Sequence, residues 1–139
     1  MSNEKEKLQQ LILQLENYID CWKQFSHYLN KAREKRYDHD DESQFLDCKC
    51  VIAQELEAIL DAVDCNDPSR EEIHGLMTKC PSIGFLAEQQ ESQLRLLENQ
   101  WHKIYIAWQS ILGQLKVALR KQEDKSAGWT FTLFSRKQA

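Results

Sequence analysis

The densest group of side chains that could bind a cation is the acidic run from Asp38 to Glu42, which also contains His39. Carboxylate oxygens bind Ca²⁺ in EF-hand loops, which need a glycine at the sixth position and a glutamate at the twelfth. Counted from Asp38, those two positions are Ser43 and Lys49. We therefore predict that the run is a solvated connection that partly caps the helix after it, through Asp41 and Gln44.

Cys48 and Cys50, together with His39, are the residues whose types could form a zinc site. Two residues that are two positions apart on a helix point about 200° away from each other, so they cannot readily share one metal ion. We interpret both thiols as core or surface side chains, and we predict no metal site.

Three other cysteines could act as a nucleophile: Cys21, Cys65 and Cys80. A catalytic thiol needs a base within hydrogen-bonding reach and a lowered pKa. No histidine is close to them in sequence, although the fold could bring His27 or His74 near one of them. The chain also has no glycine-rich phosphate-binding motif and no G-x-S-x-G motif. We predict no catalytic residue and no cofactor, and hence a protein that is not an enzyme.

Length and composition favour one helical domain. The chain has 139 residues, of which 42% are hydrophobic and 29% charged, with four glycines and two prolines. This length can bury a core without disulfides, and few turn-forming residues favour a few long helices. A net charge of -4 argues against binding to nucleic acid through a broad basic surface.

Nothing in the sequence marks a membrane span or a secretory leader. No run of about 18 apolar residues occurs, and the start, MSNEKEKLQQ, lacks the charged-then-apolar order of a signal peptide. Five cysteines, an odd number, suit a reducing compartment. We therefore expect a cytoplasmic protein that does not insert into a membrane.

Two long segments carry unbroken apolar heptad patterns, with steps that alternate between three and four residues. The last segment is expected to begin at about Ile83 and to place Trp101 and Trp108 on one face, two helical turns apart. The first pattern consists of Leu8, Leu11, Leu15, Tyr18, Trp22, Phe25, Leu29 and Ala32, and the last of Ala87, Gln90, Leu94, Leu97, Trp101, Ile104, Trp108, Ile111, Leu115 and Ala118.

The middle of the chain is less regular. A helical stripe covers residues 45–63, and the prolines at 68 and 81 interrupt the segment that leads to the last helix. Ser69 and Glu72 have the spacing of a capping box, so residues 69–80 could be a separate helix or a kinked continuation. We predict an all-α fold: an antiparallel up-down-up bundle of three long helices, with the middle segment kinked or broken near Pro68 and Pro81.

Residues 1–125 are predicted to form a single helical bundle domain, and residues 126–139 a C-terminal tail of different character. Gly128 is expected to end the helix, and apolar and threonine residues then alternate. The tail could fold back onto the bundle, or it could offer a strand or short motif to a partner. The candidate partner-binding residues are Trp129, Phe131, Leu133 and Phe134.

The last helical pattern also resembles the third helix of a spectrin repeat, through Leu94, Leu97, Trp101 and Ile104 with the later Leu115 and Leu119. Trp22, about two heptads into the first helix, is similar to the core tryptophan of that family's first helix. In an up-down-up bundle these two helices run parallel, and Trp22 and Trp101 would then share a layer. The resemblance covers residues 8–120, and it implies a scaffold or cytoskeleton-associated interaction module without catalytic residues.

The sequence therefore predicts a non-catalytic protein–protein interaction or scaffold module whose partners are other proteins. A helical adaptor, such as a secretion chaperone or effector, is an alternative with the same fold logic. A ligand-carrying helical bundle is a further alternative, but the apolar seams carry almost no ionisable groups. Homodimerisation stays open, because either seam is wide enough to pack within one chain or between two.

Overall fold

A computed structural model describes the backbone of residues 2–138 and the side chains of residues 3–125. Its five helices are α1 (Ser2–Glu34), α2 (His39–Val63), α3 (Arg70–Lys79), α4 (Ile83–Ala87) and α5 (Glu91–Gln138). Over the described residues no strand occurs. The all-α prediction is confirmed.

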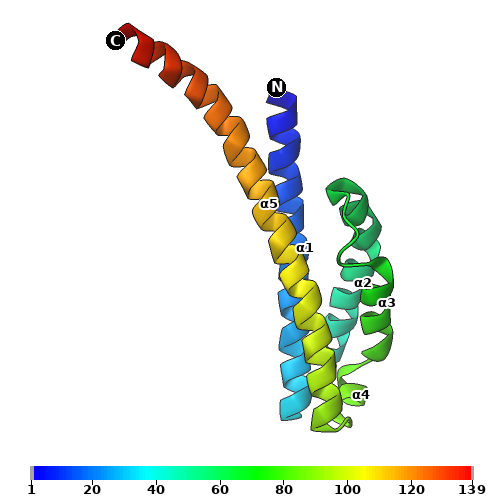
Figure 1. Cartoon of the computed structure of the whole chain (residues 1–139). Coiled ribbons are helices and arrows are strands. Elements are labelled where there is room, and N and C mark those ends of the chain that lie inside the picture. The colour runs from blue at the N-terminus through cyan, green and yellow to red at the C-terminus, as the bar shows by residue number, and fades with distance from the viewer. Residues whose placement is uncertain (1, 139) are drawn as a thin grey trace.

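Each long segment reverses the direction of the one before it (Figure 1). As residue numbers increase along α1, the residues of α5 that pair with them have decreasing numbers. Lys5 pairs with Glu123, Glu16 pairs with Lys116, and Arg33 pairs with Glu98. The first and last long helices are therefore antiparallel. The predicted up-down-up bundle, in which they would be parallel, is corrected to four antiparallel passes.

The additional pass is α3, which settles the open question about residues 69–80. α2 ends at Asp64, which adopts a left-handed conformation with φ 49°. After Pro68, the Ser69 Oγ accepts a hydrogen bond from the Glu72 backbone N–H at 3.2 Å and starts a separate helix. The predicted break and capping box are thus correct. Their effect is a full reversal of the chain, because α3 folds back beside α2 and α5 (Figure 1).

The segment after Pro81 also differs from the prediction. Ile83 begins the short helix α4, and α5 begins only at Glu91. Glu42, on the first turn of α2, accepts hydrogen bonds from the backbone N–H groups of Ile83 at 2.6 Å and Gly84 at 3.1 Å. Because these N–H groups at a helix start have no intrahelical acceptor, a carboxylate from a distant helix stabilises α4 there. A local pattern does not reveal such a partner.

The core lies between all five helices and is apolar. Its largest fully buried side chains include Trp22, Trp108, Tyr18, Phe25 and Phe45. The rings of Tyr18 and Trp108 meet edge to face, with centroids 5.4 Å apart. Among the described residues no charged side chain is buried. The heptad seams are therefore packing surfaces, as their residue types predicted.

The bounds of α5 extend past Gly128, where the sequence predicted the end of the helix. They also include the positions for which a strand was considered. A helix that has already formed gains one hydrogen bond with each added residue, and glycine costs only about 1 kcal/mol relative to alanine. The candidate partner-binding side chains at positions 129, 131, 133 and 134 lie outside the described side chains, so their role stays a prediction.

Candidate functional site

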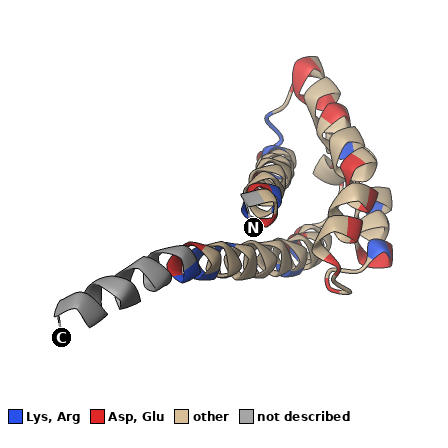
Figure 2. Cartoon of the chain, turned by 90° about the horizontal axis from the view of Figure 1, so that it is seen from above, with Lys and Arg blue, Asp and Glu red and all other residues tan. Residues whose placement is uncertain are grey.

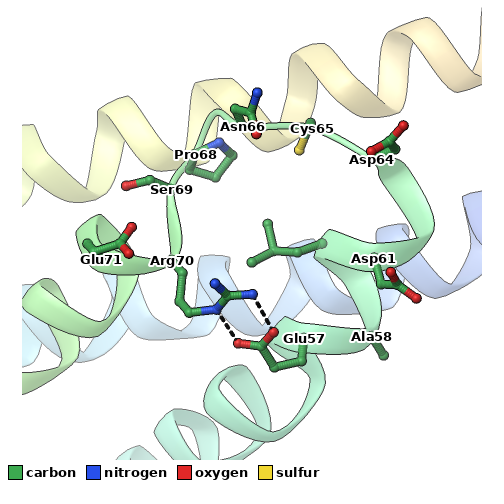
Figure 3. A pocket seen from close by; sticks show the side chains of 11 residues that line it. Glu57, Ala58, Asp61, Asp64, Cys65, Asn66, Pro68, Ser69, Arg70 and Glu71 are labelled. Carbon is green, nitrogen blue, oxygen red and sulfur yellow. Dashed lines mark hydrogen bonds and ion pairs between the residues drawn. The ribbon is translucent and has the colours of Figure 1, made fainter.

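A cavity on the described surface lies where α2 turns back into α3 (Figure 3). Its volume is about 650 Å³. Polar side chains provide much of its lining: Glu57, Asp61, Asp64, Asn66, Ser69, Arg70 and Glu71. Cys65 and the apolar Ala58, Leu60 and Pro68 complete it.

An ion pair between Arg70 and Glu57 closes one side of this cavity. The Arg70 Nη2 donates a hydrogen bond to the Glu57 Oε2 at 2.6 Å, and the Arg70 Nε donates to the other carboxylate oxygen. These hydrogen bonds lower the pKa of Glu57 from its ordinary value. Both side chains are about half exposed, so the pair links α3 to α2 at the surface.

The chemistry that this cavity could perform is limited. The carboxylates of Asp61 and Asp64 point away from the enclosed space in Figure 3. Burial raises the pKa of the Cys65 thiol, which disfavours the nucleophilic thiolate. In the part of the chain that the structure describes, no three His, Cys, Asp or Glu side chains are grouped so that they could hold a metal ion. The cavity therefore presents no activated nucleophile and no metal-binding set.

The acidic run caps the start of α2, as the sequence predicted, but through Asp38 and Asp41 and not through Asp41 and Gln44. The Asp38 Oδ1 accepts a hydrogen bond from the Asp41 N–H at 2.8 Å, and the Asp41 Oδ2 accepts one from the Asp38 N–H at 3.0 Å. The backbone hydrogen bond from Asp38 lowers the pKa of Asp41, and Lys31 lies 3.2 Å from the same carboxylate. The run is a capping box tied to the end of α1.

The helical cysteines occupy different environments. Cys48 is buried, and its Sγ donates to the Cys21 carbonyl oxygen at 3.1 Å, whereas Cys50 is exposed. Burial raises the pKa of both Cys48 and Cys80 to about 12. These thiols are therefore protonated at neutral pH. The interpretation of Cys48 and Cys50 as core or surface thiols is confirmed.

The tryptophans of the two long helices meet, but not in parallel helices as predicted. The Trp101 Nε1 donates a hydrogen bond to the Trp22 carbonyl oxygen at 2.9 Å across the antiparallel pair. Trp101 is only partly buried and stacks on Tyr105, with ring centroids 4.8 Å apart. Trp108 is fully buried. The indoles of Trp101 and Trp108 therefore differ in environment, although their spacing made them look equivalent.

Sequence reasoning missed a second heptad pattern, on the side of α5 that faces away from the core. We call it the outer seam, and it consists of exposed residues: Ser92, Leu96, Asn99, Lys103, Ile106, Ser110, Gly113 and Val117. Leu96, Ile106 and Val117 are 61%, 51% and 49% exposed. In Figure 2 α1 and α2 lie on one side of α5. At the edge of the outer seam Lys103 pairs with Glu72 of α3, and Ser110 lines a pocket with the turn residues 65–67, whereas the apolar residues of the seam are exposed. The steps of three and four residues were visible in the sequence, but the stronger core pattern of the same helix masked them.

Comparisons with protein-family models, with curated proteins and with solved structures found no match. None of the helices, as far as their residues are described, combines the length and apolar character needed to cross a bilayer.

Proposed function

We propose that the chain is a non-catalytic interaction or scaffold module that binds other proteins through the exposed side of α5. The observation that carries this proposal is the outer seam, where Leu96, Ile106 and Val117 are exposed along one side of a helix. Such positions at heptad spacing are the contacts through which one helix packs against another.

The environment of the ionisable groups supports a binding role over a catalytic one. Burial raises the pKa values of Cys21, Cys48, Cys65 and Cys80, so these thiols lack the lowered pKa that nucleophilic catalysis needs. Trp22 and Trp108 are fully covered by packing, and this favours a structural role over ligand carriage. The resemblance to spectrin repeats, which implies a similar role, stays a prediction.

Affinity capture from the native lysate tests the proposal. The intact chain is compared with the variant I106D/V117D, in which two apolar contacts of the outer seam become charged. Leu13→Asp is the matched control, because Leu13 is 60% exposed on α1 and lies away from α5's outer seam. We expect the seam variant to lose the main bound proteins and the control to retain them.

A chain that ends at Lys125 separates the seam from the tail. If the shortened chain loses its partner and the seam variant keeps it, residues 126–139 carry recognition and the assignment to the outer seam is wrong. If the intact chain retains no protein above the level of an empty matrix, the interaction role itself is contradicted.

A further inference from the structure

The side of α5 that carries the outer seam is basic, although the whole chain has a net charge of -4. Four exposed cations lie on or beside the seam: Arg95, Lys103, Arg120 and Lys121. Asp124 is the one carboxylate on this side among the residues whose side chains are described. A surface that joins apolar positions with cations fits an acidic helix as its partner.

The exposed side of α2 has the opposite charge. We call it the acidic arc, and its exposed carboxylates are Asp40, Asp47, Glu57 and Asp61. It also carries Leu46, which is 56% exposed, and the small residues Ser43, Cys50 and Ala58. In Figure 2 acidic positions, red on the ribbon, recur along α2. The chain therefore carries two helix faces of complementary charge.

We propose, building on the interaction function proposed above, that the outer seam of one copy of the chain docks on the acidic arc of a second copy. Lys103 and Arg120 have the same separation in sequence as Asp40 and Glu57. If the two helices pack antiparallel, one register therefore places each of these cations opposite one of these carboxylates. In that register Arg120 lies opposite Asp40, and Lys103 lies opposite Glu57. Opposite charges at matched spacing are what fix partner and direction in helix pairs.

Lys103 and Glu57 each form an ion pair within the chain as well. The Lys103 Nζ lies 3.5 Å from the Glu72 Oε2, and Glu57 binds Arg70. Lys103, Glu57 and Arg70 remain half exposed or more. Exposed pairs contribute little to stability and leave their charges accessible. Docking therefore joins these pairs into a wider network and does not require either of them to break.

Gly113 is consistent with a second helix at this position. A glycine inside a helix lowers its stability relative to alanine. Nothing inside the chain requires this glycine, since a Cβ atom added to it would meet no atom within 4 Å. In the proposed register the backbone at Gly113 and Gln114 lies opposite Leu46 and Asp47. The missing side chain leaves room for Leu46 of the second copy.

The geometry makes this contact head-to-tail. The outer seam cannot pair with itself favourably, because cations would face cations. The seam lies on α5 and the acidic arc on α2, so each copy uses one helix face to bind and offers another. Contacts of this kind extend into chains or rings of copies.

Analytical ultracentrifugation of the full chain at several protein concentrations tests the association. Charge attraction is weakly screened at about 0.01 M salt and strongly screened at about 1 M. We expect a weight-average mass above the monomer's 16.4 kDa that rises with concentration at low salt and returns toward the monomer at high salt. A chain that stays monomeric at low salt over the whole range overturns the proposal.

Charge reversal identifies the surfaces. K103E/R120E replaces the two seam cations of the proposed register with carboxylates, and D40K/E57K replaces the two opposing arc carboxylates with cations, so in either variant alone like charges would meet at both positions of the register. We expect both variants to be monomeric and an equimolar mixture of the two to associate again. K7E/K23E on α1 changes the net charge as much as K103E/R120E does and leaves both faces intact, so it should associate as the unaltered chain does.

Circular dichroism checks that every variant is folded. If D40K/E57K is not, D40N/E57Q replaces it, and weaker association of that variant alone is then the expected result. Association that survives both reversals, or that is lost equally in K7E/K23E, overturns the proposed pairing. If a strictly monomeric chain captures other proteins, the self-association proposal is wrong and the proposed interaction function still holds. If a monomeric chain binds nucleic acid and K103E/R120E abolishes that binding, nucleic acid and not a second copy is the ligand of the outer seam.

Discussion

The two ends of the α1–α5 pair are built from the same heptad pattern but are buried to different degrees. Among the side chains of residues 3–125, the buried ones on α1 begin at Ile12 and those on α5 end at Leu112. Beyond these points Leu8, Leu11, Leu115 and Leu119 are only partly buried. We call residues 3–11 and 113–125 the open end, and residues 12–34 and 91–112 the covered end.

The difference arises from the number of neighbours that each end has. At the covered end, α2 and α4 also pack against α1. The Tyr18 hydroxyl there donates a hydrogen bond to the Ile52 carbonyl oxygen of α2 at 2.9 Å. At the open end the contacts between α1 and α5 include ion pairs such as Lys5 with Glu123, at 3.9 Å between exposed side chains. A leucine that packs against one helix keeps part of its surface in water, so the same residue contributes less to stability there.

The largest expected effect at the covered end is that of Trp108→Ala. Trp108 is fully buried and packs on Tyr18, so its removal leaves a large cavity. We expect a loss of about 3–5 kcal/mol in the free energy of unfolding, measured by urea denaturation. His102→Ala, an exposed change on the same helix, is the control. A loss of under about 1 kcal/mol would show that the core relaxes around the missing ring.

A matched pair of leucine variants compares the two ends directly. Leu15 is completely buried at the covered end, whereas Leu119 is partly exposed at the open end. We expect Leu15→Ala to cost about 2–5 kcal/mol in urea denaturation and Leu119→Ala about 1 kcal/mol. Equal losses at low protein concentration would contradict the description of residues 113–125 as an open end.

Trp101→Phe measures the hydrogen bond between the two tryptophans. Phenylalanine retains an aromatic ring beside Tyr105 but removes the indole N–H that reaches the Trp22 carbonyl oxygen. We expect a loss of about 1 kcal/mol, because a hydrogen bond of this kind makes a modest net contribution. Hydrogen exchange of the Trp101 indole N–H, followed by NMR, gives an independent check. Rapid exchange in the intact chain would indicate that water replaces the carbonyl oxygen.

Glu57→Gln, at the surface connection between α2 and α3, should have the smallest effect and a defined pH dependence. The hydrogen bonds from Arg70 hold the pKa of Glu57 below its ordinary value of 4.5 in the folded chain. The unfolded chain therefore binds more protons in that range, so the contribution of Glu57 is present above pH 4.5 and is lost as the pH falls through the folded pKa.

Thermal unfolding at two pH values checks this prediction. We expect Glu57→Gln to lower the melting temperature slightly at about pH 7 and to leave it unchanged at about pH 2. Glu55→Gln is the matched control on the same helix, because Glu55 is exposed and forms no ion pair with a described residue. A difference between the Glu57 variant and the intact chain that persists at low pH would contradict the role of the ion pair.

Features that depend on neighbours in sequence could be predicted well. The seams of α1 and α5, the start of α3 at Ser69 and the helix-capping role of the acidic run all follow from residues within a few turns of one another. Hydrogen bonds at helix ends and the 3.6-residue period act over this short range. The same helical period predicts that Cys48 and Cys50 point in different directions, and in the structure Cys48 is buried and Cys50 is exposed.

Features that depend on distant contacts were missed. The N–H groups at the start of α4 bind Glu42, which is far away in sequence, and no local pattern marked Ile83–Ala87 as a separate helix. The cavity between Glu57 and Glu71 exists because the chain reverses at Pro68, whereas the sequence left a kinked continuation open. The outer seam could be recognised only from the structure, which shows which face of α5 packs against the core and which face is exposed.

The order of residues along this chain is sufficient to specify long amphipathic helices, their caps and an apolar face on each, because these follow from local geometry and side-chain chemistry. The direction in which α1 and α5 pair, the unequal burial of Trp101 and Trp108, and the difference between the covered and open ends arise only when the helices assemble. Burial is a property of a side chain and all its neighbours together, and here those neighbours come from helices far apart in the sequence.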